Sequence, residues 1–131
     1  MINSVSTPVF FLYNEEFSMK RILLVDDSKE VLSTYKAMLE IEGYTVDTAL
    51  NGEAALVLVG QHPLDLLITD FDMGPGMKGD ELSREVRKKF SSLRIIMVTG
   101  SEVPASYPHP SMQKGVRRED FIAEVKYWLN N

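Results

Sequence analysis

Short apolar runs that end in acidic or hydroxyl residues alternate along this chain with segments of helical period, and this alternation constrains the fold most. Residues 22–25 form the first such run. The segment after it has apolar residues at the spacing of one helix face, namely Val31, Leu32, Tyr35, Met38 and Leu39. Gly43 is placed to end that helix. A strand followed by a helix is therefore the first unit that the sequence predicts.

The same unit recurs along the rest of the chain. Further strands are predicted at residues 44–49, 64–69 and 94–98, with a brief fifth at Met112 and Gln113. Asn51 can cap a second helix that ends near Gly60, and a third is predicted over residues 80–90. The last helix is expected to turn five side chains inward: Phe121, Ile122, Val125, Trp128 and Leu129.

Strands that alternate with helices imply right-handed crossovers between parallel strands. The predicted fold is therefore α/β, with a doubly wound five-stranded parallel sheet in the flavodoxin-like order 2-1-3-4-5 and helices on both faces. In such sheets ligands bind beyond the carboxyl ends of the strands. We expect the functional site at that edge.

Composition limits the classes of function. The chain has 131 residues, of which 44% are hydrophobic, as expected of one domain with a real core. The net charge of −5 argues against direct binding to nucleic acid or to a phospholipid membrane. The absence of cysteine excludes disulfides and thiolate metal sites and fits a cytoplasmic location.

The first eighteen residues stand apart from this pattern. Their apolar run, residues 9–13, is too short to span a membrane, and no basic residue precedes it as in a secretory signal. Residues 1–18 are therefore interpreted as an extension that is either not native or disordered, or that docks its aromatic side chains on the domain or on a partner. The domain itself is expected to span residues 19–131.

Residues with chemical potential follow the predicted strands. Asp26 and Asp27 follow the first strand, Asp70 the third and Thr99 the fourth, and Lys114 can follow the fifth. Because the first and fourth strands flank the third in the predicted order, these side chains should share one crevice. Carboxylates about 4 Å apart repel by roughly 4 kcal/mol at an effective dielectric of 20, so the cluster needs a cation.

A hard divalent cation meets that need, because Mg²⁺ prefers oxygen ligands and tolerates carboxylates beside waters and phosphate oxygens. Asp70 then becomes a nucleophile toward phosphorus. The cation and Lys114 would neutralise the transferring group, and Thr99 could donate a hydrogen bond to one of its oxygens.

The ordered motifs resemble the receiver domain of two-component response regulators, from about Met19 to Asn131. They are LVDDS at residues 24–28, LITDFDM at residues 67–73, VTG at residues 98–100, and the solitary Lys114. The resemblance implies the following roles: Asp70 as phosphoacceptor, Asp26 and Asp27 as the acidic pair, the Asp72 backbone carbonyl as a further magnesium ligand, Thr99 as the switch hydroxyl, and Lys114 as the lysine that pairs with the phosphoryl group.

The resemblance also implies partners. It points to a stand-alone, chemotaxis-regulator-like receiver that a histidine kinase or a histidine phosphotransfer protein phosphorylates. Because no effector domain follows Asn131, output is expected through an unknown downstream protein, with the chain a monomer or weak dimer. Such a domain is not an enzyme beyond its own phosphorylation and dephosphorylation.

Two departures from the family pattern flank the expected site. The family reads Asp-x-x-Met-Pro after the acceptor, whereas here Gly74 separates Met73 from Pro75 and predicts a longer, looser loop. The family lysine precedes a proline in a cis peptide, whereas Gly115 follows Lys114. A cis bond before a residue other than proline costs about 2.5–4 kcal/mol, so a trans link is expected.

The third departure lies between the fourth strand and the lysine. Receivers fit a helix and a strand there, but residues 100–113 contain prolines that disfavour a helix, namely Pro104, Pro108 and Pro110. The fourth family helix is expected to be reduced or missing. Ser111 stands where the family has an aromatic residue that couples to the threonine. We expect Thr99 instead to bias the order of residues 101–110, with Tyr107 changing burial.

Two other functions fit part of the pattern. In a haloacid-dehalogenase-like phosphohydrolase, Asp70 would be the nucleophile and Asp72 the acid/base. That family needs an acidic pair downstream, whereas here the pair lies upstream. A degenerate receiver that acts as a phosphorylation-independent interaction module is the second alternative.

Three further residues are expected to have no role in the site. His62 and His109 lie beside prolines and are expected at the surface of loops. Trp128 is expected to anchor the last helix in the core.

Overall fold

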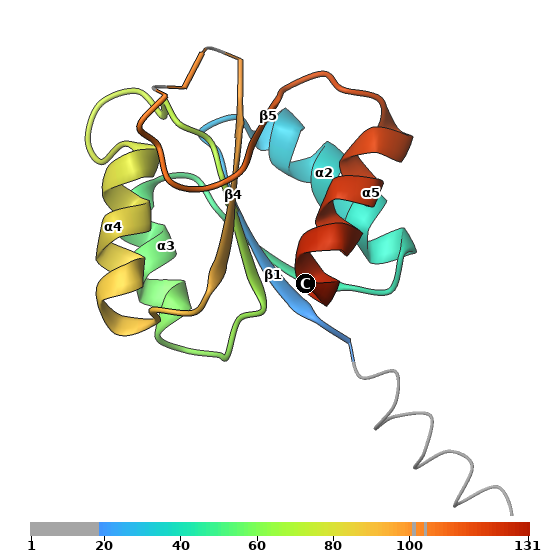
Figure 1. Ribbon diagram of the computed structural model, residues 1–131, viewed down its shortest axis with the longest axis horizontal. Coiled ribbons are helices and arrows are strands. Elements are labelled where there is room, and N and C mark those ends of the chain that lie inside the picture. Colours follow the sequence, from blue (N-terminus) through green and yellow to red (C-terminus); the bar gives the residue numbers. More distant parts are fainter. Residues whose placement is uncertain (1–18, 101, 104) are drawn as a thin grey trace, which may run out of the picture.

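The computed structural model describes residues 19–100, 102–103 and 105–131, so the predicted extension of residues 1–18 lies outside the described residues. One parallel sheet forms the centre of the fold (Figure 1). Its strands are β1 (Arg21–Val25), β2 (Thr45–Ala49), β3 (Leu66–Thr69), β4 (Arg94–Thr99) and β5 (Ser111–Gln113). They are arranged in the order β2-β1-β3-β4-β5, which confirms the predicted topology.

Helices cover both faces of the sheet. They are α2 (Lys29–Ile41), α3 (Gly52–Val59), α4 (Gly79–Lys89) and α5 (Arg118–Asn130). Figure 1 shows α3 and α4 on one side of the sheet and α2 and α5 on the other. Within the described part of the chain, no helix has the length and apolar character needed to cross a membrane.

The first strand shows why this sequence fills two cores. Successive side chains of a strand point to opposite faces, and every residue from Ile22 to Val25 is buried. Ile22 and Leu24 join the cluster under α2 and α5, whereas Leu23 and Val25 join the cluster under α3 and α4. A continuous apolar run is therefore what a central parallel strand requires.

Side-chain caps begin two of the helices, one of them at the predicted place. The Asn51 carboxamide accepts a hydrogen bond from the backbone N–H of Ala54 at 2.7 Å, which confirms its predicted capping role. Ser28 caps α2 in the same way and accepts from the backbone N–H of Val31 at 3.2 Å. This second cap starts α2 directly after the acidic pair that follows β1.

Some boundaries and burials differ from the sequence-based expectations. β3 begins at Leu66, two residues later than predicted. Phe90 is 41% exposed, because it ends α4 with a non-helical backbone and so leaves the buried face of that helix. Trp128 is only partly buried, because it lies in the last turn of α5, where its indole N–H donates to Glu124.

The connection between β4 and β5 has no helix in its described residues, which form turns, bends and irregular segments, as the predicted loss of the family helix requires. Ser101 and Pro104 lie outside the described residues. His62 is exposed as expected, but His109 is half-buried because its ring packs edge-on against Tyr107.

Candidate functional site

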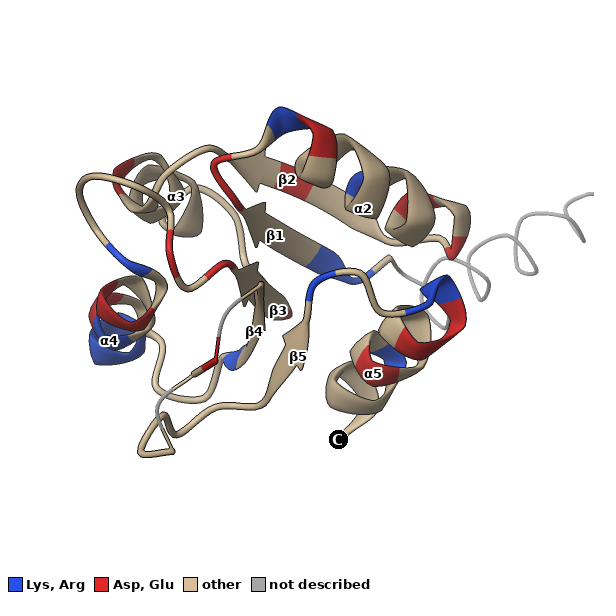
Figure 2. Cartoon of the chain, turned by 90° about the horizontal axis from the view of Figure 1, so that it is seen from above, with Lys and Arg blue, Asp and Glu red and all other residues tan. Residues whose placement is uncertain are grey.

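The predicted site residues meet at the carboxyl edge of the sheet. Asp26 and Asp27 follow β1, Asp70 follows β3, Thr99 is the last residue of β4, and Lys114 comes directly after β5. Figure 2 shows acidic segments at the ends of β1 and β3 on this edge. The topology brings these residues together because β3 lies between β1 and β4.

Three carboxylates form a compact group. One oxygen from each of Asp26, Asp27 and Asp70 lies within 4.8 Å of the others. Asp26 and Asp70 are each only 4% exposed, whereas Asp27 is open to solvent. Hard oxygen donors beside an open side fit Mg²⁺, which keeps several waters when proteins bind it.

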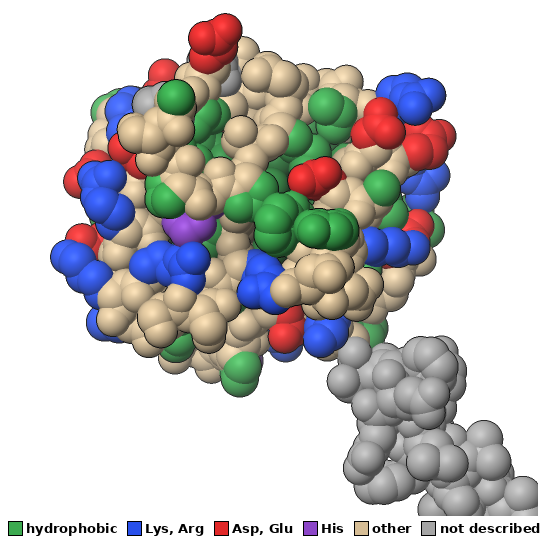
Figure 3. Space-filling model, viewed as in Figure 1, with side chains coloured by type: hydrophobic (Ala, Val, Ile, Leu, Met, Phe, Trp, Pro, Cys, Tyr) green, Lys and Arg blue, Asp and Glu red, His purple; other side chains and the backbone are tan. Residues whose placement is uncertain are grey.

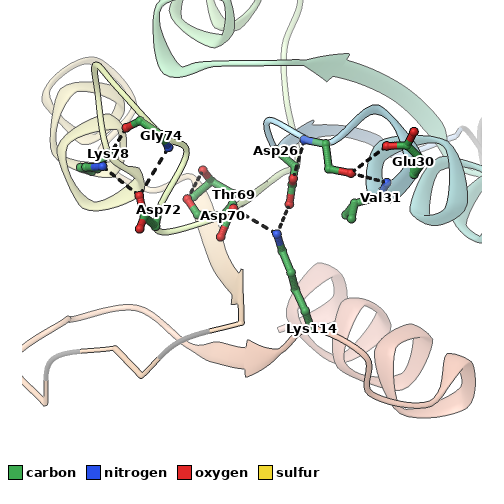
Figure 4. Close-up of polar contacts among 10 residues, drawn as sticks. Asp26, Glu30, Val31, Thr69, Asp70, Asp72, Gly74, Lys78 and Lys114 are labelled. Carbon is green, nitrogen blue, oxygen red and sulfur yellow. Dashed lines mark hydrogen bonds and ion pairs between the residues drawn. The ribbon is translucent and has the colours of Figure 1, made fainter.

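Lys114, which follows β5, pairs with two of these carboxylates. Its Nζ lies 2.8 Å from Asp26 Oδ2 and 3.1 Å from Asp70 Oδ2 (Figure 4). Its backbone N–H donates to the carbonyl of Thr99 at 2.8 Å, so β4 also fixes the position of the lysine. The link from Lys114 to Gly115 is trans as expected, since the described residues contain no cis peptide bond.

Burial and charge set the protonation states of the group. Burial raises the pKa of Asp70, the nearby Asp26 carboxylate raises it further, and the hydrogen bond from Lys114 opposes both. Burial lowers the pKa of Lys114, but its hydrogen bonds to the two carboxylates outweigh this and leave the pKa above its ordinary value. Lys114 is therefore a fixed cation beside an unusually basic carboxylate.

The backbone of the sheet holds both buried carboxylates. The N–H of Asp70 donates to the carbonyl of Val25 at 2.9 Å, and the N–H of Asp26 donates to that of Ala49 at 3.1 Å. The Asp26 side chain also accepts from the N–H of Ser28 at 2.9 Å. The backbone bonds fix the main chain of both residues, and the Ser28 N–H and the Lys114 ammonium hold the carboxylates themselves.

The Asp72 carboxylate is directed elsewhere. Its Oδ1 lies 2.8 Å from Lys78 Nζ and accepts from the N–H of Gly74 at 3.4 Å (Figure 4). The hydrogen bond from Lys78 lowers the pKa of Asp72. Lys78 also donates to the carbonyl of Gly74 at 2.7 Å, so this lysine cross-links the longer loop that was predicted here. No local sequence signal identifies Lys78, which the sequence reasoning missed.

Gly79 is a second residue that the sequence reasoning left without a role. Its N–H donates to the carbonyl of Phe71 at 2.8 Å. A Cβ atom at Gly79 would lie 2.1 Å from the carbonyl oxygen of Asp70, so only glycine fits. The only signal was a glycine directly before the predicted helix of residues 80–90, a place where close approach of another backbone can require glycine.

Comparisons with known proteins agree with this geometry. The family model described as "response regulator receiver domain" matches residues 22–122. A probable transcriptional regulator, ycf27, from Cyanidium caldarium is 40% identical over 81 residues, which are 62% of this chain and 32% of that protein. The virulence sensor protein BvgS from Bordetella pertussis is 45% identical over 67 residues, which are 51% of this chain and 5% of that protein. The chain thus spans only a small part of these curated relatives.

Solved structures are similar over most of the chain. A CheY-like receiver domain protein from Methanospirillum hungatei has a TM-score of 0.80 at 30% identity, covering 86% of this chain and 95% of that one. TrrA from Thermotoga maritima, solved in complex with Mg²⁺ and BeF, has a TM-score of 0.77 at 36% identity, covering 84% and 99%. With the family match over residues 22–122, these findings place the chain in the response regulator receiver domain family.

Proposed function

We propose that this chain is a phosphorylation switch in which Asp70 accepts a phosphoryl group with the help of Mg²⁺. The observation that carries the proposal is the group formed by Asp26, Asp27 and Asp70, bridged on one side by the Lys114 ammonium. A structural cluster alone would not need a third carboxylate open to solvent. A phosphoryl-transfer site does, because phosphate oxygens and waters must reach the metal.

The proposed reaction is a transfer from a phosphohistidine of a partner. One oxygen of Asp70 attacks phosphorus, the bond from phosphorus to the histidine nitrogen breaks, and its electron pair stays on the imidazole. Lys114 stabilises negative charge on the phosphoryl oxygens, and the Thr99 hydroxyl donates a hydrogen bond to one of them. Bound by Asp26, Asp27, Asp70 and the backbone carbonyl of Asp72, Mg²⁺ would neutralise further charge on the group.

The proposed partners are those of a two-component pathway in the cytoplasm. A histidine kinase or a histidine phosphotransfer protein supplies the phosphoryl group, and a downstream protein reads the switched surface. The chain acts as a monomer or weak dimer. Its chemistry is limited to its own phosphorylation and dephosphorylation, so it does not turn over a separate substrate.

Acetyl phosphate and intact mass spectrometry test the acceptor. With Mg²⁺, the wild-type chain is expected to gain the mass of one phosphoryl group, and chelation of the metal should abolish the gain. Asp70→Asn should gain nothing. Asp65→Asn, the same change at an exposed aspartate at the opposite end of the sheet, is the matched control and should react like wild type.

The alternatives give different outcomes in the same assay. A wild-type chain that gains no phosphoryl group despite bound Mg²⁺ would support a phosphorylation-independent interaction module. Steady hydrolysis of a phosphomonoester that Asp72→Asn abolishes would support a phosphohydrolase. Equal labelling of Asp70→Asn and wild type would end the assignment of Asp70.

A further inference from the structure

A chain of hydrogen bonds leads from the acceptor strand to the β4–β5 connection. It starts where Gly79 rests on the backbone that carries Asp70. Gly79 N–H donates to the Phe71 carbonyl at 2.8 Å, and no side chain fits between this glycine and the Asp70 carbonyl. The two backbones are in direct contact with no space between them. A shift of the Asp70 backbone must therefore move the first turn of α4.

Ser83 lies one turn further along α4 and continues the chain. Its hydroxyl is 2.8 Å from the Gly79 carbonyl and 2.9 Å from the hydroxyl of Tyr107, and the residue is 2% exposed. A serine hydroxyl has one proton to donate. When that proton goes to the Gly79 carbonyl, Tyr107 must be the donor to Ser83.

Tyr107 is held in the state that this arrangement requires. A tyrosine phenol carries its proton at neutral pH, and burial raises the pKa of Tyr107 further. The ring also packs edge-on against His109, with ring centroids 5.3 Å apart. Ser83 is buried and Tyr107 is partly buried, so the Ser83 hydroxyl cannot readily replace this hydrogen bond with one to water.

The connection that carries Tyr107 is fixed near both of its ends. Its first end continues from β4, where the Thr99 carbonyl accepts from the N–H of Lys114 at 2.8 Å. Near its second end, the Pro110 carbonyl accepts from the N–H of Met97 at 2.9 Å. Between these points, the bond from Tyr107 to Ser83 is a side-chain attachment of the loop to another element.

We propose that Ser83 and Tyr107 are positioning residues that couple the Asp70 backbone to the β4–β5 connection, so that this connection responds to the acceptor through α4. The inference rests on the proposed function. It supplies a route that does not require an aromatic residue on β5, where Ser111 stands and is exposed. The route runs from Asp70 through Gly79, Ser83 and Tyr107.

Hydrogen exchange with the phosphate mimic beryllofluoride tests the coupling. Exchange of peptides spanning residues 100–113 is measured with Mg²⁺ alone and with Mg²⁺ and beryllofluoride, and binding of the mimic is followed separately by fluorine NMR. The wild-type connection should change its exchange when the mimic binds. Tyr107→Phe, which removes only the hydroxyl, should bind the mimic but lose this response.

The variants also have an expected effect without the mimic. Loss of one ordinary hydrogen bond should speed exchange in the connection by about fivefold. Ser83→Ala should reproduce both effects, and the double variant should respond no further than either single one. Tyr127→Phe makes the same chemical change on the exposed face of α5 and should behave like wild type.

The two proposals fail in different ways. If the mimic binds and Tyr107→Phe and Ser83→Ala keep the full wild-type response, the coupling is overturned while the acceptor site stands. The coupling is also overturned if Tyr107→Phe no longer binds the mimic, because the hydroxyl would then serve the acceptor site itself. If wild type does not bind the mimic in the presence of Mg²⁺, the proposed function fails and the coupling fails with it.

Discussion

At the scale of single residues, Lys114 determines how two buried carboxylates coexist. Asp26 and Asp70 lie almost out of solvent, and the Lys114 ammonium contacts both. Removing one partner of a buried charge group costs more than the group contributes when complete, because the remaining charge is left uncompensated. A neutral side chain in place of Lys114 should therefore lower the free energy of unfolding, whereas a neutral side chain in place of Asp70 should not.

We predict that Lys114→Met lowers the free energy of unfolding at neutral pH by about 1–3 kcal/mol without metal, because two adjacent carboxylates lose their cation. Asp70→Asn should leave it unchanged or raise it, because burial and Asp26 both disfavour the charged carboxylate. Urea unfolding measures both. A Lys114→Met variant as stable as wild type would contradict the compensating role of the lysine.

Lys78 gives a second prediction, which rests on the proposed function and concerns the lifetime of the proposed acyl phosphate on Asp70. Its ion pair occupies the Asp72 carboxylate at 2.8 Å. Lys78→Met should free that carboxylate to orient an attacking water and shorten the half-life by up to about fivefold, the range that an exposed ion pair allows. Lys88→Met, which removes another exposed ion-paired lysine from the α4 region, is the matched control.

Comparing Lys78→Met in the wild-type chain and in an Asp72→Asn chain tests whether Lys78 acts through Asp72. In an Asp72→Asn chain, Lys78→Met should no longer change the half-life. An equal change in both backgrounds would show that Lys78 acts by a route other than Asp72, such as its bond to the Gly74 carbonyl.

At the scale of elements, the start of α4 is shaped by the strand end beside it. Gly79 begins the helix against the backbone of Asp70 and Phe71. Its backbone is not in the left-handed region, so the need for glycine comes from space and not from conformation.

Gly79→Ala should therefore be strongly destabilising, by about 3 kcal/mol or more, because its Cβ would force the helix away from the acceptor strand. Gly60→Ala at the end of α3 is the control, since the nearest atom to its added Cβ lies at 3.8 Å. Thermal or urea unfolding separates the two variants. Equal stability of both would contradict the close packing at Gly79.

At the scale of the whole molecule, charged and hydrophobic side chains are unevenly distributed over the surface (Figures 2 and 3). Acidic segments gather where β1 and β3 end (Figure 2). On the face seen in Figure 3, hydrophobic side chains gather near the middle, with both basic and acidic side chains around them. His109 lies in the β4–β5 connection. Because its imidazole is half-buried, protonation of this side chain should lower the stability of the folded chain.

Burial lowers the pKa of His109, and the Arg87 guanidinium lowers it further. The unfolded chain then binds the proton more readily, so stability contributed by neutral His109 is present above about pH 6.5 and is lost as the pH falls below it. His109→Gln should lose less stability than wild type between about pH 7.5 and pH 5.5. His62→Gln is the control at an exposed histidine, and an unchanged slope in His109→Gln would contradict the prediction.

The local pattern of the sequence determined the elements and their order in the sheet. The apolar run of β1, the cap at Asn51 and the prolines after β4 act through neighbouring residues, so they could be read without the fold. The acidic pair and Asp70 were found because strand ends of a parallel sheet meet at one edge, which follows from topology alone.

Only the tertiary structure decided the detailed pairing of side chains across long separations. The predicted topology already placed Lys114 near Asp70, but the bridge that its ammonium makes between Asp26 and Asp70 was visible only in the structure. Tyr107 is 24 residues from Ser83, so no local period relates them. The packing of α4 on the end of β3 decided the close approach at Gly79. The ends of α4 and α5 likewise decided the exposure of Phe90 and Trp128, because burial depends on what covers a helix end and not on its hydrophobic period.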